Sequence, residues 1–383
     1  MPIVPPSPDS ARFWLAALLC GEVPIAPALA ESILLDAARA EGVLALCHNR
    51  LRQSPAWTQY PATLRAALTR YAYQDVAVEM ARAKELRDVL DALARQSLPV
   101  LLLKGAALAY TLYPEPYLRD RCDTDLLLPS REAAECAGYV LQTLAYQQPI
   151  TVPGDLVHHE LGCYKTDASG LTHALDVHWR LSNATLFAKH FTFAELAAAA
   201  VPIPALGPHA WGLSSIHALV LACIHRVNNM RGGTADRLVW LYDIHLLAQR
   251  FTDESWQQVM TLVEERSLCG PCLDGLSAAQ ILLATVLPEE VLSRLRAGAD
   301  REGFDPRQFR QRWRFEWLTF RALPSATVRL RWLGQRLFPA AGYLRNQYGF
   351  QNPLCLPWYY GVRIVRGVHV LVRNRKTASS LIS

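Results

Sequence analysis

The stretch 101–128, LLLKGAALAYTLYPEPYLRDRCDTDLLL, constrains the fold of this chain most strongly. It predicts a buried strand at 100–103, a Lys104-Gly105 turn, a short helix over 105–112, and a strand over 121–128 that carries Asp123 and Asp125. Residues two apart in a strand face the same side, so both carboxylates project together from a buried segment. Burying these charges is costly unless something compensates them, and a divalent cation is the usual compensation. The stretch therefore predicts a metal site.

A second acidic signature follows fifty residues later. After a helix predicted over 131–145 with Ser130 as its cap, two strand-like runs at 161–165 and 171–179 are joined by Asp167-Ala-Ser-Gly170, which predicts a hairpin turn. The second run contains LDVHW, and its period of two places Asp176 and His178 on one face.

These motifs together resemble a known family. A glycine turn after a strand, a helix, and Asp-x-Asp on the next strand are similar to the core of the nucleotidyltransferase superfamily with the DNA polymerase β type palm. KGAALA followed by R-x-x-x-D-x-D-LLL, with LDVHW further on, most resembles the uncharacterised bacterial nucleotidyltransferase family grouped near the toxin-like AbiEii proteins. The resemblance covers about residues 30 to 250 and is strongest at 101–128 and 174–180.

The resemblance implies an enzyme. We expect magnesium-dependent transfer of a nucleoside monophosphate from a nucleoside triphosphate, with ATP as the expected nucleotide, to an unidentified acceptor with release of pyrophosphate. The resemblance makes Asp123, Asp125 and Asp176 the catalytic residues, which would hold two Mg²⁺ ions. His178 is expected to orient Asp176 or to contact substrate.

The resemblance also implies a nucleotide-binding turn. Gly105 would let the backbone approach the triphosphate, and the N-terminus of the following helix would offer free N–H groups. Many members carry a second Gly or a Ser after this glycine, whereas this chain has Ala106. Lys104 and Arg119 are cations that would contact the phosphates instead.

Two other functions remain open. The first is a non-catalytic nucleotide-binding or regulatory module that keeps the palm without turnover, which Ala106 favours. The second is a metal-dependent phosphohydrolase that uses Asp123, Asp125 and His178. Among the later residues, we expect His217 and His225 to be core histidines, although the resemblance leaves a role in the site open for His225. We expect Arg237 and Asp243 to form structural interactions between helices.

The fold class expected is α+β, a small mixed-sheet palm embedded in a mostly helical protein. Helices are predicted over 11–20, 61–96, 214–229, 235–251, 254–266, 272–286 and 288–298. We expect an N-terminal helical region at 1–97, the palm at 98–212, a helical domain at 213–305 and a basic, aromatic-rich helical tail at 306–383. The segment Cys269-Gly-Pro-Cys272 is interpreted as a Gly-Pro break between two helices rather than a redox motif.

Charge is distributed unevenly along the chain. Of the 39 Lys and Arg and the 34 acidic residues, fourteen basic residues and one acid, Glu316, lie in 307–383, which leaves the first 306 residues at about −8. The tail interleaves Arg with Trp, Phe, Tyr and Leu, so it predicts contact with an anionic membrane surface or a nucleic acid. A solvated basic face packed on the acidic body is the competing interpretation.

Composition bears on the compartment. The chain has 383 residues, of which 51% are apolar and 19% charged, as in ordinary globular proteins. The start, MPIVPPSPDSARFW, lacks the features of a signal peptide, and no apolar run reaches the length of a transmembrane helix. With nine scattered cysteines, we expect reduced thiols and a cytoplasmic protein, with peripheral membrane association through the tail.

Overall fold

The computed structural model describes residues 11–22, 30–149, 156, 158–182, 184–230 and 236–379. Residues 1–10, on which the expectation of a chain without a signal peptide rests, lie outside the described part. The helices are α1 (Ala11–Leu19), α2 (Glu31–Ala40), α3 (Leu44–Gln53), α4 (Ala62–Arg95), α5 (Lys104–Thr111), α6 (Arg131–Thr143), α7 (Phe193–Ala198), α8 (Ser215–Asn229), α9 (Leu238–Gln249), α10 (Asp253–Glu265), α11 (Cys269–Leu283), α12 (Glu289–Glu302), α13 (Arg307–Arg310), α14 (Arg312–Arg321), α15 (Ala326–Leu337), α16 (Ala341–Tyr348) and α17 (Leu356–Ser379). The strands are β1 (Leu101–Leu103), β2 (Thr124–Leu127), β3 (Glu160–Thr166), β4 (Thr172–His178), β5 (Val201–Pro202) and β6 (Trp211–Gly212).

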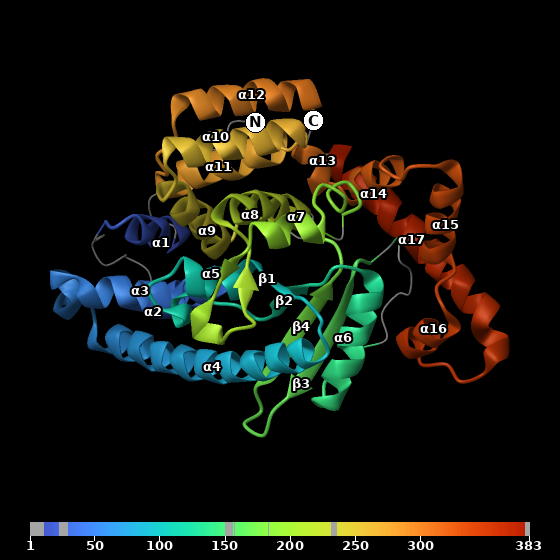
Figure 1. Ribbon diagram of the computed structural model, residues 1–383, viewed down its shortest axis with the longest axis horizontal. Coiled ribbons are helices and arrows are strands. Elements are labelled where there is room, and N and C mark those ends of the chain that lie inside the picture. Colours follow the sequence, from blue (N-terminus) through green and yellow to red (C-terminus); the bar gives the residue numbers. More distant parts are fainter. Residues whose placement is uncertain are drawn as a thin grey trace.

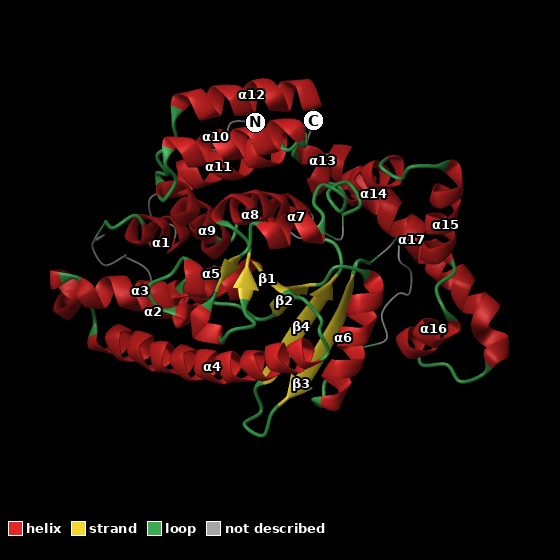
Figure 2. Ribbon diagram, viewed as in Figure 1, coloured by secondary structure: helices red, strands yellow, loops and turns green. Residues whose placement is uncertain are grey.

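The strands form one mixed sheet with the order β3-β4-β2-β1-β6-β5. β1 pairs antiparallel with β2, β2 pairs parallel with β4, and β3 pairs antiparallel with β4. The sheet lies at the centre of the molecule, with helices above, below and beside it (Figure 1, Figure 2). The expected α+β class, a small mixed sheet in a mostly helical protein, is confirmed.

Two hydrophobic cores flank the sheet. One joins α4, α6 and the sheet through residues such as Leu90, Leu102 and Leu141. The other joins the N-terminal helices to α8, α9 and α11 through residues such as Leu15 and Leu241. Leu102 and Leu103 are neighbours on β1 and enter different cores, because successive side chains of a strand point to opposite faces. The four-part division of the chain stays a prediction.

Local signals in the sequence explain several element ends. Ser130 caps α6, since its hydroxyl accepts a hydrogen bond from the backbone N–H of Ala133 at 3.2 Å. The hairpin turn between β3 and β4 is stabilised by Asp167, whose Oδ1 accepts from the backbone N–H groups of Ser169 and Leu171. One boundary differs, because β2 begins at Thr124 and not at residue 121, so Asp123 precedes the strand.

The Cys269-Gly-Pro-Cys272 segment is not the helix break that the sequence suggested. It forms the first turn of α11, where proline is tolerated because its missing N–H would have no partner inside the helix. The carboxylate of Glu302 caps this turn by accepting from the N–H groups of Cys269 and Gly270 at 2.9 and 2.8 Å. Burial raises the pKa of Cys269 to about 12, the opposite of what a reactive thiolate needs.

The basic tail folds back onto the rest of the chain. Helices α13 to α17 lie together at one end of the molecule, at the right in Figure 1. Phe309 and, less deeply, Phe315 pack into the helical core. Within the described residues, no helix combines the length and the apolar character needed to cross a bilayer.

Candidate active site

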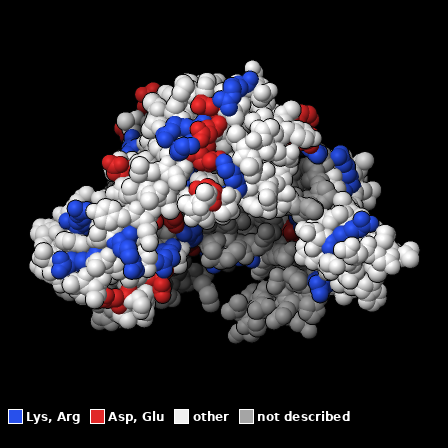
Figure 3. Space-filling model, turned by 90° about the horizontal axis from the view of Figure 1, so that it is seen from below, with Lys and Arg blue, Asp and Glu red and all other residues white. Residues whose placement is uncertain are grey.

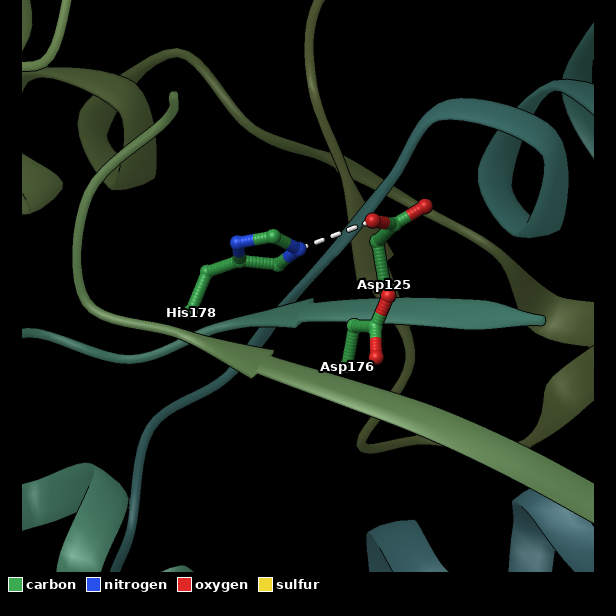
Figure 4. A group of neighbouring side chains, drawn as sticks. All are labelled: Asp125, Asp176 and His178. Atoms are coloured by element: carbon green, nitrogen blue, oxygen red, sulfur yellow. Dashed lines mark hydrogen bonds and ion pairs between the residues drawn. The ribbon is translucent and has the colours of Figure 1, made fainter. Parts of the chain in front are cut away.

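Asp125 and Asp176 form the centre of the site. They are register partners on the parallel strands β2 and β4, so their side chains leave the sheet side by side. Asp176 and His178 lie two residues apart on β4 and share its face. One ligand atom from each of Asp125, Asp176 and His178 lies within 4.8 Å of the others, and Figure 4 shows the three side chains converging.

His178 is hydrogen-bonded to Asp125 and not to Asp176, so it does not orient Asp176 directly; the alternative role expected of it, contact with substrate, stays a prediction. Its Nε2 lies 2.8 Å from Oδ1 of Asp125, the contact drawn in Figure 4. Its Nδ1 lies 3.2 Å from Oε2 of Glu160, the register partner of His178 on β3. His178 therefore lies between two carboxylates, and its hydrogen bond to Asp125 orients the ring, while Nδ1 has no hydrogen-bond partner among the described residues.

Lys104 is the second partner of Asp125. Its Nζ donates to the same Oδ1 at 2.6 Å. Lys104 has a φ of 47°, in the left-handed region that non-glycine residues rarely adopt, and it is the first residue of α5. Burial alone would lower the pKa of Lys104, but Asp125 outweighs this effect and raises it. The strained residue thus aims an ammonium group at the central carboxylate.

The other acids of the site are less well compensated. Asp176 makes no hydrogen bond or ion pair within the described residues, and burial together with Glu160 and Asp125 raises its pKa to about 6. Burial and Asp125 also raise the pKa of Asp123. By contrast, Lys104 and His178 hold the pKa of Asp125 well below its usual range despite its burial. This excess of carboxylates over cations fits a bound cation.

A cavity of about 510 Å³ opens beside these acids, and we call it the first pocket. Among the predicted site residues, Lys104, Gly105, Arg119, Asp123, Asp125 and Asp176 line it. Ala106 is 1% exposed and does not line it. The structure therefore gathers the three predicted carboxylates around one cavity, and Asp123 reaches it from the loop before β2.

Arg119 is already engaged by protein. Its guanidinium donates to both carboxylate oxygens of Asp243, at 2.6 to 3.0 Å, and Asp243 also accepts from the hydroxyl of Tyr113 at 2.7 Å. This buried cluster ties the loop before β2 to α9. Arg237 donates to the backbone carbonyl of Ala40 at 2.9 Å and lies 3.7 Å from Asp120. Both arginines thus hold helices against this loop at the rim of the first pocket.

Two site residues carry weak sequence signals. Glu160 is not marked by a motif, although the hairpin register places it opposite His178. His225, expected in the core, lines the first pocket, and its ring meets Trp240 edge-on with centroids 4.6 Å apart. Burial and the charge of Lys104 lower the pKa of His225 to about 3, so its imidazole is neutral.

Comparison with known proteins agrees with this geometry. Residues 28–284 match the model of a family described as uncharacterised nucleotidyltransferase. The chain belongs to this nucleotidyltransferase family. Membership identifies it as an enzyme of the transferase class. The search of curated proteins finds no match. The finer placement near the AbiEii proteins stays a prediction.

Proposed function

We propose that this nucleotidyltransferase moves a nucleoside monophosphate from ATP to the hydroxyl of an acceptor and releases pyrophosphate. The observation that carries the proposal is the register pairing of Asp125 with Asp176 at the wall of the first pocket. Family membership supports the reaction class. The acceptor oxygen forms a bond to the α-phosphorus, the bond from that phosphorus to the β-phosphate oxygen breaks, and the acceptor proton passes to water.

Asp123, Asp125 and Asp176 are the residues that would hold magnesium. Mg²⁺ takes oxygen ligands, so these carboxylates supply the donors, while His178 positions Asp125. When bound, Mg²⁺ activates the attacking hydroxyl and neutralises charge on the leaving pyrophosphate. Lys104 and the backbone at Gly105 would contact the phosphates, because both line the pocket at the N-terminus of α5.

The test uses ATP labelled at the α-phosphate, Mg²⁺ and a mixture of small metabolites. We expect labelled nucleotide to enter a new product with one pyrophosphate released per transfer, and Asp176→Asn to abolish both. Arg131→Gln, a change on the exposed start of α6, is the matched control. Release of inorganic phosphate without pyrophosphate would refute nucleotidyl transfer.

A second candidate is a metal-dependent phosphohydrolase. His178 lies in the cluster with Asp125 and Asp176, and a histidine among carboxylates suits Mn²⁺ or another transition metal better than Mg²⁺. The same experiment separates the candidates, because hydrolysis would yield inorganic phosphate or unattached AMP even in the presence of metabolites.

We also propose that the protein is cytoplasmic and associates with membranes through its tail. All nine cysteines are free thiols in the described residues. The tail exposes large apolar side chains, among them Leu354 at 86% and Trp358 at 71%, beside its many arginines. In Figure 3, the part at the right carries blue Lys and Arg side chains with little red. A segment that exposes both basic and large apolar groups suits an anionic lipid bilayer better than RNA.

A further inference from the structure

A second cavity adjoins the acidic cluster. Its volume is about 550 Å³, in the range of small-molecule sites, and we call it the second pocket. Lys104, Leu221 and His225 line both pockets. Asp125 and Asp176 face the first pocket, whereas His178 and Glu160 face the second. The two pockets therefore meet at Lys104, which donates a hydrogen bond to Asp125.

The tail builds the outer wall of the second pocket. The lining residues from this segment are Phe315 and Glu316 on α14, Arg336 on α15, Tyr343 on α16 and Arg363 on α17. All lie beyond residue 284, where the family match ends. The matched region thus supplies the inner wall of this cavity, and the tail supplies its outer wall.

The cations in this wall differ in how they are used. Arg336 pairs with Glu316 at 2.7 Å and stacks over Trp332. Arg363 lies over the ring of Tyr343, and its Nε donates to the backbone carbonyl of Arg336 at 3.2 Å. Within the described part of the chain, Arg363 pairs with no acid. Because no carboxylate offsets its charge, Arg363 is the cation in this wall that can bind an anionic ligand.

The inner wall offers groups for hydroxyls. Asn228 donates through Nδ2 to the hydroxyl of Ser182 at 2.8 Å, while its Oδ1 is buried without a hydrogen-bond partner. This oxygen has almost no exposed surface, so Asn228 shapes the wall and does not present the atom to a ligand. Glu160 also lines this wall and can accept hydrogen bonds from ligand hydroxyls.

We propose that the second pocket binds the acceptor, a small polyhydroxylated molecule with one phosphate or carboxylate group. The anionic group lies against Arg363, and the hydroxyls donate to Glu160. One hydroxyl then faces the cluster and attacks the α-phosphorus of the nucleotide in the first pocket, with the bond changes described above. This inference rests on the proposed transferase function and names the substrate class of the same site.

Calorimetry on the full-length protein with Mg²⁺ and a non-hydrolysable analogue, α,β-methylene-ATP, tests this assignment. The probes are glucose 6-phosphate, gluconate and glucose, which share a polyhydroxylated chain and differ in the anionic group. We expect one or both anionic probes to bind at least tenfold more tightly than glucose. Whichever binds more tightly identifies phosphate or carboxylate as the group recognised.

The variants locate the binding. Arg363→Gln should weaken the anionic probe at least tenfold, and Arg363→Lys should restore part of the affinity. Arg345→Gln, on the exposed side of α16, removes an equal charge from the tail outside the pocket and should have no effect. Melting temperatures and binding of the ATP analogue show that each variant is folded.

The outcomes separate this inference from the proposed function. If the wild-type protein fails to bind the ATP analogue with Mg²⁺, the transferase proposal fails. If it binds the analogue but binds no anionic probe, or binds glucose equally well, the acceptor assignment is overturned and the transferase proposal stands. Equal losses in Arg363→Gln and Arg345→Gln would also overturn it, because they would indicate a general charge effect.

Discussion

Asp125 and Asp176 are direct neighbours on paired strands, yet only Asp125 has its charge compensated by protein. Lys104 and His178 both contact Oδ1 of Asp125, while Asp176 has no such partner in the described structure. Two carboxylates of the same type in the same register therefore have different effects on stability. This difference makes the two positions separable by experiment.

The two Asn substitutions should diverge in metal-free protein. Asp125→Asn leaves Lys104 facing a neutral group and should destabilise the fold by about 2 kcal/mol. Asp176→Asn removes a charge that nothing offsets and should leave the melting temperature unchanged or raise it. Thermal melting in a chelator checks this, and equal destabilisation by both changes would contradict it. Both variants should lose the extra stability that ATP with Mg²⁺ confers.

The raised pKa of Asp176 predicts a pH dependence. The pKa of Asp176 is higher in the folded protein than in the unfolded chain, so protonation of Asp176 stabilises the fold. This stabilisation is complete below about pH 4 and is lost as the pH rises through about 6. In metal-free protein, Asp176→Asn should gain stability over the wild type by ~1–2 kcal/mol between these limits. Urea unfolding at pH 4, 5, 6 and 7 measures it. A constant difference across this range would show that the pKa of Asp176 is not raised by folding.

Gly105→Ala tests the nucleotide-binding turn. A Cβ there would lie 3.5 Å from Nη1 of Arg119 and from Cβ of Arg121, which are ordinary contacts, so the fold should tolerate it. The added methyl group projects at the start of α5 and should weaken ATP binding at least tenfold. Gly334→Ala is the matched control, because a Cβ at this helical glycine meets nothing within 4 Å. Equal nucleotide affinities in both variants would remove Gly105 from the site.

Membrane binding by the tail is tested with charge substitutions that keep its fold. The double change Leu354→Glu and Trp358→Glu replaces two exposed apolar side chains and should abolish binding to phosphatidylglycerol vesicles. Tyr139→Glu, a similarly exposed site on α6, should retain it. Vesicle sedimentation at low and moderate salt provides the measurement. Wild-type protein that sediments with RNA but not with vesicles would favour a nucleic acid instead.

Local patterns predicted the segments of β1 to β4, because periodicity and turn chemistry mark them without long-range information. The two-residue strands β5 and β6 were not predicted, since so short a segment shows no periodicity. The hairpin register also places Glu160. Thr166 and Thr172 pair next to the turn, and following both strands away from the turn pairs Glu160 with His178. The left-handed backbone at Lys104 was not foreseeable, because the glycine that usually signals it stands one residue later. Contacts such as Arg119 with Asp243 join residues 124 positions apart and depend on how α9 packs.

The boundary of the family match has a consequence for comparing relatives. The residues that line the first pocket lie within 28–284, while Arg363 and its neighbours in the outer wall of the second pocket lie beyond it. A fragment ending at residue 284 would keep the carboxylates but lose this wall, and water would then compete with the acceptor for the activated phosphate. We therefore expect enzymes that share the matched region but differ in their C-terminal helices to differ in the acceptor that they use.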